Sequence, residues 1–159
     1  MSIENSVADK KLKNNEAFLE NFIPYAMYRI TNHLNTELQN DLRPLKINVS
    51  RWRVLAALHA VDGRTMGGLC TYTMIAQSAL TRVIDNMEKE KLVSRCLQEN
   101  DNRHILVHLT DKGREKFEHI YPKVLSRQDR VLIDFSKSEH EQLLVYLRRI
   151  EKNLNISNA

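Results

Sequence analysis

Residues 77–86 carry a row of polar side chains whose hydrogen-bonding groups match those on the edges of DNA bases. Glutamine pairs with adenine through two hydrogen bonds, and arginine pairs with guanine or with a phosphate. Serine and threonine more often bind phosphates, which fixes the register of a protein on the duplex without reading its sequence. The candidates for these contacts are Gln77, Ser78, Thr81, Arg82 and Asn86.

The same segment carries an apolar pattern that predicts a helix. Leu80, Val83, Ile84 and Met87 recur at i, i+3, i+4 and i+7, so they share one face and are expected to pack on a core. The polar candidates lie on the opposite, exposed face. Because a polar helix face is usually just a solvated surface, the DNA-binding interpretation depends on the elements that follow.

A predicted β-hairpin follows this helix. Residues 92–97 and 104–109 look like two strands, and the turn-rich residues between them would form the tip. Arg103 at the tip is expected to enter a minor groove, where the negative potential favours a cation. Asp101 would orient its guanidinium by a paired hydrogen bond, and Arg95 on the first strand would contact a phosphate.

The other predicted elements are helices, so the chain is expected to be mainly α with a small β-hairpin wing. Apolar residues spaced three to four apart predict a long helix over residues 18–42, with Pro24 in its first turn. Polar residues suited to helix starts stand at Ser50, Thr110 and Ser136, the last with Glu139 in a capping-box pattern. A short helix is expected over residues 65–73.

Three segments, within roughly residues 20–135, resemble the MarR family of bacterial transcription regulators. Residues 52–55 resemble the second helix of one branch of the family, and residues 77–88 resemble the recognition helix. The third segment resembles the wing and the helix that follows it; its matching positions are residues 92–95, Asp101, Arg103 and residues 109–113. The resemblance implies a winged helix-turn-helix with N- and C-terminal dimerisation helices.

The resemblance also implies a function. Family members are homodimers that bind a pseudo-palindromic operator, usually repress nearby genes, and in many cases leave the DNA when a small aromatic or phenolic acid binds. The expected division is a flexible N-terminus over residues 1–16, a dimerisation region over 17–44 and 115–159, and a DNA-binding domain over 45–114. Apolar helix faces at residues 18–42 and 143–156 give a physical reason for dimerisation, since they exceed what one small winged helix can cover.

The sequence departs from the family pattern at both ends of the predicted recognition helix. Ala76 stands where a polar N-cap is usual, and such a loss costs about 1 kcal/mol. Thr73 or Ser78 is then the alternative cap. Lys91 replaces the usual glycine, so a residue with a side chain must make the turn out of the helix.

The resemblance places effectors between the dimerisation helices and the winged helix. An aromatic acid needs one cation for its carboxylate and apolar walls for its ring. Arg29, His33 or Arg53 would hold the carboxylate; the alternative is that Trp52 is plain core and Arg29 a surface charge. The full candidate set is Tyr25, Tyr28, Arg29, His33, Trp52, Arg53 and His59.

Composition and motifs exclude several other classes. A net charge of +4 permits DNA binding without requiring it. No motif of an enzyme active site is present, and no cofactor is expected. The six histidines lack partners for a metal site.

Cys70 and Cys96 are expected to be packed side chains. The protein is expected in the reducing cytoplasm, without a membrane span. The alternatives are a metal- or redox-responsive regulator of this fold, or a winged helix that binds proteins.

Overall fold

The structure, a computed structural model, describes residues 18–98 and 101–156, except for the side chains of residues 98 and 101–104. The predicted flexible segment over residues 1–16 lies outside the described residues. The chain divides into two compact units, Met1–Asn40 and Asp41–Ala159.

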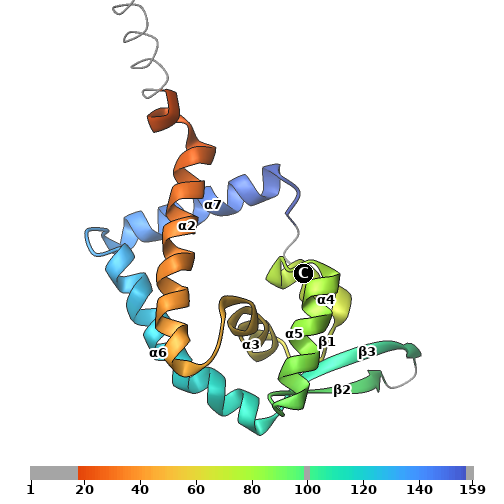
Figure 1. The fold of residues 1–159 in the computed structure, drawn as a ribbon. Helices are drawn as coiled ribbons and strands as arrows, with labels where there is room; N and C mark the ends of the chain where they lie inside the picture. The colour runs from red at the N-terminus through yellow and green to blue at the C-terminus, as the bar shows by residue number, and fades with distance from the viewer. Residues whose placement is uncertain (1–17, 99–100, 157–159) are drawn as a thin grey trace, which may run out of the picture. The chain divides into compact units, whose positions relative to one another are not determined.

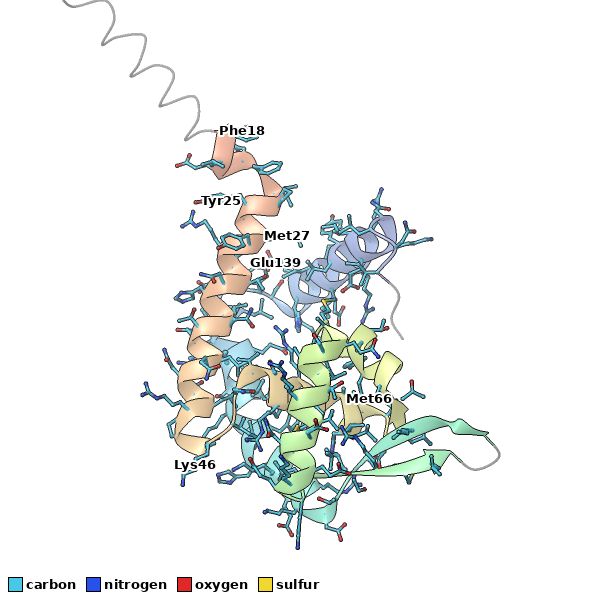
Figure 2. The ribbon with its side chains drawn as sticks, turned by 45° about the vertical axis from the view of Figure 1, so that its right-hand side comes forward. Phe18, Tyr25, Met27, Lys46, Met66 and Glu139 are labelled. Carbon is cyan, nitrogen blue, oxygen red and sulfur yellow. The ribbon has the colours of Figure 1, made fainter. Side chains whose placement is uncertain are left out.

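The first unit contains most of one long helix. Residues 18–21 are helical, Phe22 interrupts the helix, and α2 then spans Ile23–Leu42 with Pro24 in its first turn, as predicted. Phe18, Tyr25 and Met27 project from this part of the chain in Figure 2. Phe18 and Phe22 stack with ring centroids 5.2 Å apart, and both rings are exposed.

The second unit contains five further α-helices among the described residues, which Figure 1 shows with the short sheet. They are α3 (Val49–Ala60), α4 (Met66–Thr73), α5 (Gln77–Lys89), α6 (Asp111–Val131) and α7 (Lys137–Asn153), with the 3₁₀-helix η1 (Arg43–Leu45) before them. Asn48, not the predicted Ser50, caps α3, because its side-chain oxygen accepts a hydrogen bond from the Arg51 amide at 2.9 Å. Thr110 and Ser136 cap their helices as predicted, and Thr65 caps α4.

The core of the second unit is built from apolar residues of α3, α4, α5, α6 and the sheet. Its fully buried side chains include Leu55, Leu58, Leu69, Leu80, Ile84, Met87, Val107 and Ile120. Three of these come from the apolar face predicted for α5, while Val83 is partly exposed. Burial of this face fixes which side of α5 points to solvent.

The sheet has three antiparallel strands in the order β1-β3-β2: β1 (Arg64–Thr65), β2 (Val93–Gln98) and β3 (Asp101–Leu109). The β2–β3 hairpin extends away from the helices of the second unit (Figure 1). Strand β3 begins at Asp101, three residues before the predicted start. Strand β1 was not predicted, because two residues are too short to show an alternating pattern.

Among the described residues, no helix is long and apolar enough to cross a membrane.

Candidate nucleic-acid interface

Helix α5 presents its predicted polar face to solvent. Gln77, Ser78, Thr81, Arg82 and Asn86 are all exposed. The Thr81 hydroxyl donates to the Gln77 carbonyl at 2.9 Å, so its oxygen remains an acceptor while its proton is engaged. Within the described part of the chain Arg82 makes no ion pair, which leaves its guanidinium available for a base or a phosphate.

The N-terminus of α5 has no side-chain cap. Ala76 is in the capping position and offers no acceptor. The Thr73 hydroxyl, an alternative predicted from the sequence, donates instead to the Leu69 carbonyl at 2.6 Å within α4. The first amide groups of a helix point away from its own carbonyls and attract anions. The exposed start of α5 therefore has amide donors that a DNA phosphate can accept.

The other end of α5 turns through Lys91 in a left-handed conformation. Its φ is 59°, as the replacement of a glycine at this position led us to expect. The Lys91 and Leu92 amides donate to Glu88 and Met87 carbonyls at 2.9 and 2.8 Å, which closes the helix. A left-handed residue with a side chain costs roughly 1–2 kcal/mol relative to an unstrained one.

Arg95 on β2 is held by the recognition helix. Its guanidinium donates to Asp85 and Glu88, each at 2.7 Å, and its side chain is 24% exposed. Partial burial opposes the charge, but the hydrogen bonds and charges of the two carboxylates outweigh burial and raise the pKa of Arg95. A phosphate contact, as predicted for Arg95, would have to compete with both carboxylates.

For the predicted pair at the wing tip, Asp101 and Arg103, the structure describes only the backbone. Asp101 and Arg103 belong to β3, but their side chains lie outside the described residues. The predicted orientation of Arg103 by Asp101 therefore remains a prediction.

The effector candidates divide between the two units. Tyr25, Tyr28, Arg29 and His33 lie on α2 in the first unit. There the Arg29 guanidinium lies 5.8 Å from the centre of the Tyr25 ring, and His33 faces Glu37 at 3.6 Å. A single pocket shared with the candidates of the second unit remains a prediction.

In the second unit, Trp52 and Arg53 line a pocket of about 300 Å³. Tyr72 and Met74, which the sequence did not single out, line it too. Trp52 is 7% exposed and stacks on Phe117 at 5.2 Å. His59 stacks on the same Phe117 ring at 4.0 Å. Trp52 therefore belongs to the core and also to the wall of a pocket, a combination that periodicity alone does not show.

The two cysteines differ in their exposure to solvent. Cys96 is exposed on β2, contrary to the expectation that both cysteines are packed; Cys70 is partly buried. The alternation of the strand places Cys96 on the outer face of the hairpin. No group of three His, Cys, Asp or Glu side chains that could hold a metal ion occurs among the described residues.

These elements define a winged helix-turn-helix, in which α5 is the recognition helix and the β2–β3 hairpin is the wing. A MarR family model matches residues 45–104, which cover α3, α4, α5 and most of the wing. The transcriptional activatory protein BadR of Rhodopseudomonas palustris is 29% identical over 153 residues, covering 94% of this chain and 85% of BadR.

Solved structures agree with this assignment. A MarR family transcriptional regulator from Silicibacter pomeroyi superposes with a TM-score of 0.83 and 28% identity, over 91% of this chain and 98% of that one. The repressor CouR, solved with a 23-mer DNA duplex, gives a TM-score of 0.74 and 25% identity, over 84% and 94% of the two chains. The chain belongs to the MarR family and is a DNA-binding transcriptional regulator, not an enzyme.

Proposed function

We propose that the protein binds a pseudo-palindromic operator as a homodimer through α5 and the wing. The observation that carries this proposal is the exposed polar face of α5, where Arg82 makes no ion pair with any described residue and the first amides are uncapped. Gln77, Arg82 and Asn86 read bases, and Ser78 and the first amides of α5 hold phosphates. Thr81 adds a phosphate contact when its hydroxyl turns from the Gln77 carbonyl to donate to the DNA. Arg103 enters the adjacent minor groove.

A salt titration with DNA from the upstream region of its own gene tests this proposal. Affinity should fall linearly in log salt, because phosphate contacts release counterions. Arg82→Ala and Arg103→Ala should each lower the affinity. Arg130→Ala, which removes an exposed arginine near the end of α6, is the matched control and should leave it unchanged. If no DNA from that region shifts at low salt, the proposed operator binding is wrong.

The homodimer is supported by exposed apolar side chains on α7 and at the residue that follows it, Leu154. Val145, Tyr146 and Leu154 are each more than half exposed, and exposed apolar faces of this kind usually mark interfaces. In a dimer the two recognition helices would lie about one turn of DNA apart.

Sedimentation equilibrium measures the oligomeric state directly. The expected mass is twice that of the 159-residue chain. Val145→Asp should shift the mass toward one chain, because it places a charge in the apolar contact. Gln142→Asp, at an exposed polar position of the same helix, should not. A single-chain mass for the unmodified protein would contradict the proposal.

We further propose that the protein represses nearby genes and that a small aromatic or phenolic acid releases it from DNA. The pocket lined by Trp52, Arg53 and Tyr72 supports this, because it offers aromatic walls and one cation. The effector would act by binding one dimer conformation better than the other. Since BadR is described as an activatory protein and CouR as a repressor, the direction of regulation needs its own test.

Two measurements test repression and effector release. Deleting the gene should raise transcription of the neighbouring genes, whereas a fall in their transcription would show that the protein activates them. In solution, 4-hydroxybenzoate should bind and weaken DNA binding. Arg53→Ala and Arg29→Ala should be compared, since unchanged ligand affinity in either variant removes that arginine from the proposed site.

A further inference from the structure

A second pocket of the DNA-binding unit, of about 400 Å³, lies where α5 ends and α6 begins. Its lining includes four cations, Lys46, Arg51, Lys112 and Lys116, and two carboxylates, Glu90 and Glu115. The formal charge of the lining is therefore positive by two. Lys46 is the residue directly after η1, and Figure 2 labels it.

Arg51 supplies an unused donor to this pocket. Its side chain is 15% exposed, and its terminal nitrogen pairs with Glu90. The Nε atom of the same guanidinium is buried and has no hydrogen-bond partner among the described residues. A buried charged donor without a partner is unfavourable, so an acceptor placed here would be stabilised.

Two of the lysines are fixed in position by the backbone. Lys112 donates to the Glu90 carbonyl and Lys116 to the Leu45 carbonyl, each at 2.8 Å. An ammonium group has three donors, so each lysine keeps two for another acceptor. Because both ammonium groups are already held in place, a ligand would lose little side-chain entropy on binding them.

We propose that this pocket binds a phosphate-type oxyanion, supplied either by the DNA backbone or by a small phosphorylated molecule. The anion binds the Arg51 guanidinium and the lysine ammonium groups, where it competes with Glu90 for the guanidinium. Glu90 caps the C-terminal end of α5, and Lys112 holds its carbonyl. Occupation of the pocket thus alters the contacts at the end of the recognition helix.

Calorimetry with inorganic phosphate tests the site without DNA. The titration keeps ionic strength constant with NaCl and compares the unmodified chain with Lys46→Asn and Lys123→Gln. Asparagine tolerates the left-handed φ of 54° at residue 46, and Lys123 is an exposed lysine outside the pocket. Thermal unfolding verifies that both variants are folded.

The expected result is saturable binding of one phosphate per chain, about fivefold weaker in Lys46→Asn because one nearby charge is lost. Lys123→Gln should bind as the unmodified chain does. Absence of saturable binding overturns the proposal. Equal weakening in the two variants also overturns it, because it would show a general charge effect.

The source of the anion is decided by a DNA titration of the same variants. If a DNA phosphate occupies the pocket, Lys46→Asn lowers the slope of log affinity against log salt by about 0.9, and phosphate displaces DNA more than NaCl of equal ionic strength does. If a free anion occupies it, that slope is unchanged while phosphate binding remains. Both outcomes support an anion site in this pocket, and they distinguish a DNA phosphate from a free anion as its ligand.

Discussion

Arg95 of the wing and Asp85 of the recognition helix are joined by a hydrogen-bonded ion pair of 2.7 Å. Glu88, one turn further along α5, holds the other terminal nitrogen of the same guanidinium at 2.7 Å. A planar guanidinium that bridges two carboxylates fixes direction as well as distance. The wing therefore sets the position of the helix that carries Arg82, and its one positive charge offsets one of the two negative charges that would otherwise repel DNA.

Replacing Arg95 with methionine should weaken both stability and DNA binding. Charge-assisted hydrogen bonds contribute roughly 1.5–3 kcal/mol, and the partial exposure of the carboxylates reduces this, so we expect a loss of about 1–2 kcal/mol in the free energy of unfolding. Urea unfolding and DNA titration measure the two effects.

A double-mutant comparison separates this positioning role from a direct phosphate contact. In a chain carrying Asp85→Asn and Glu88→Gln, Arg95→Met should have little further effect on DNA affinity, because the ion pairs are already gone. If Arg95 contacts a phosphate, as the sequence predicts, its loss still lowers the affinity and the salt dependence in that background.

Lys91→Gly should stabilise the protein. Lys91 adopts φ of 59° in the turn from α5 into β2, a conformation that glycine adopts without strain. The gain is reduced by the greater freedom of glycine in the unfolded chain, so we expect about 0.5–1 kcal/mol. Lys89→Gly, in the last turn of the same helix, is the control and should destabilise instead. A lower unfolding midpoint for Lys91→Gly would show that the lysine side chain has contacts that outweigh its strain.

The position and the buried face of this recognition helix were predictable, because they depend on residues close together in the sequence. The spacing of Leu80, Ile84 and Met87 fixes the buried face, and therefore the exposed one. The absence of a cap at Ala76 also follows from the identity of one residue, whereas the turn at Lys91 was expected only because the resemblance to the family places a glycine there. Asn48 was missed as a cap because Ser50, two residues later, is an equally suitable residue type.

The pockets could not be predicted in the same way. Trp52 and Tyr72 line one pocket from two helices, and Arg51 and Lys112 line the other from segments 61 residues apart in the sequence. Such sites depend on how the helices pack, which no periodicity reports. The sequence identifies Arg95 as a candidate phosphate contact, but its two carboxylate partners are visible only in the folded chain.

Gly113→Ala should strongly destabilise the junction between the wing and α6. A Cβ at residue 113 would lie 2.0 Å from the Leu92 carbonyl oxygen, which is backbone and cannot rotate away. The Gly113 amide also donates to the Thr110 cap at 3.0 Å. Relief requires a shift of α6 away from Leu92, the residue before β2, at a cost of roughly 1–3 kcal/mol or more. Gly67→Ala, where a new Cβ has open surroundings in α4, is the control and should be neutral or stabilising. Equal unfolding midpoints for the two variants would contradict this close packing.

The start of α7 should show a pH dependence set by Glu139. Its carboxylate accepts hydrogen bonds from the Ser136 hydroxyl at 2.6 Å and the Ser136 amide at 2.8 Å, which together lower the pKa of Glu139 below 4.5. Because the folded pKa is the lower one, this contribution to helix stability is present above pH 4.5 and is lost as the pH falls through the folded pKa.

An NMR titration of the Glu139 side-chain carboxyl carbon measures this shift directly. Ser136→Ala removes the hydroxyl donor, which is the larger cause, so the pKa of Glu139 should rise toward 4.5. Ser126→Ala is the control, because the Ser126 hydroxyl donates to the Lys123 carbonyl in α6 and has no part in this cap. An identical Glu139 titration in the unmodified chain and Ser136→Ala would show that the capping box does not form in solution.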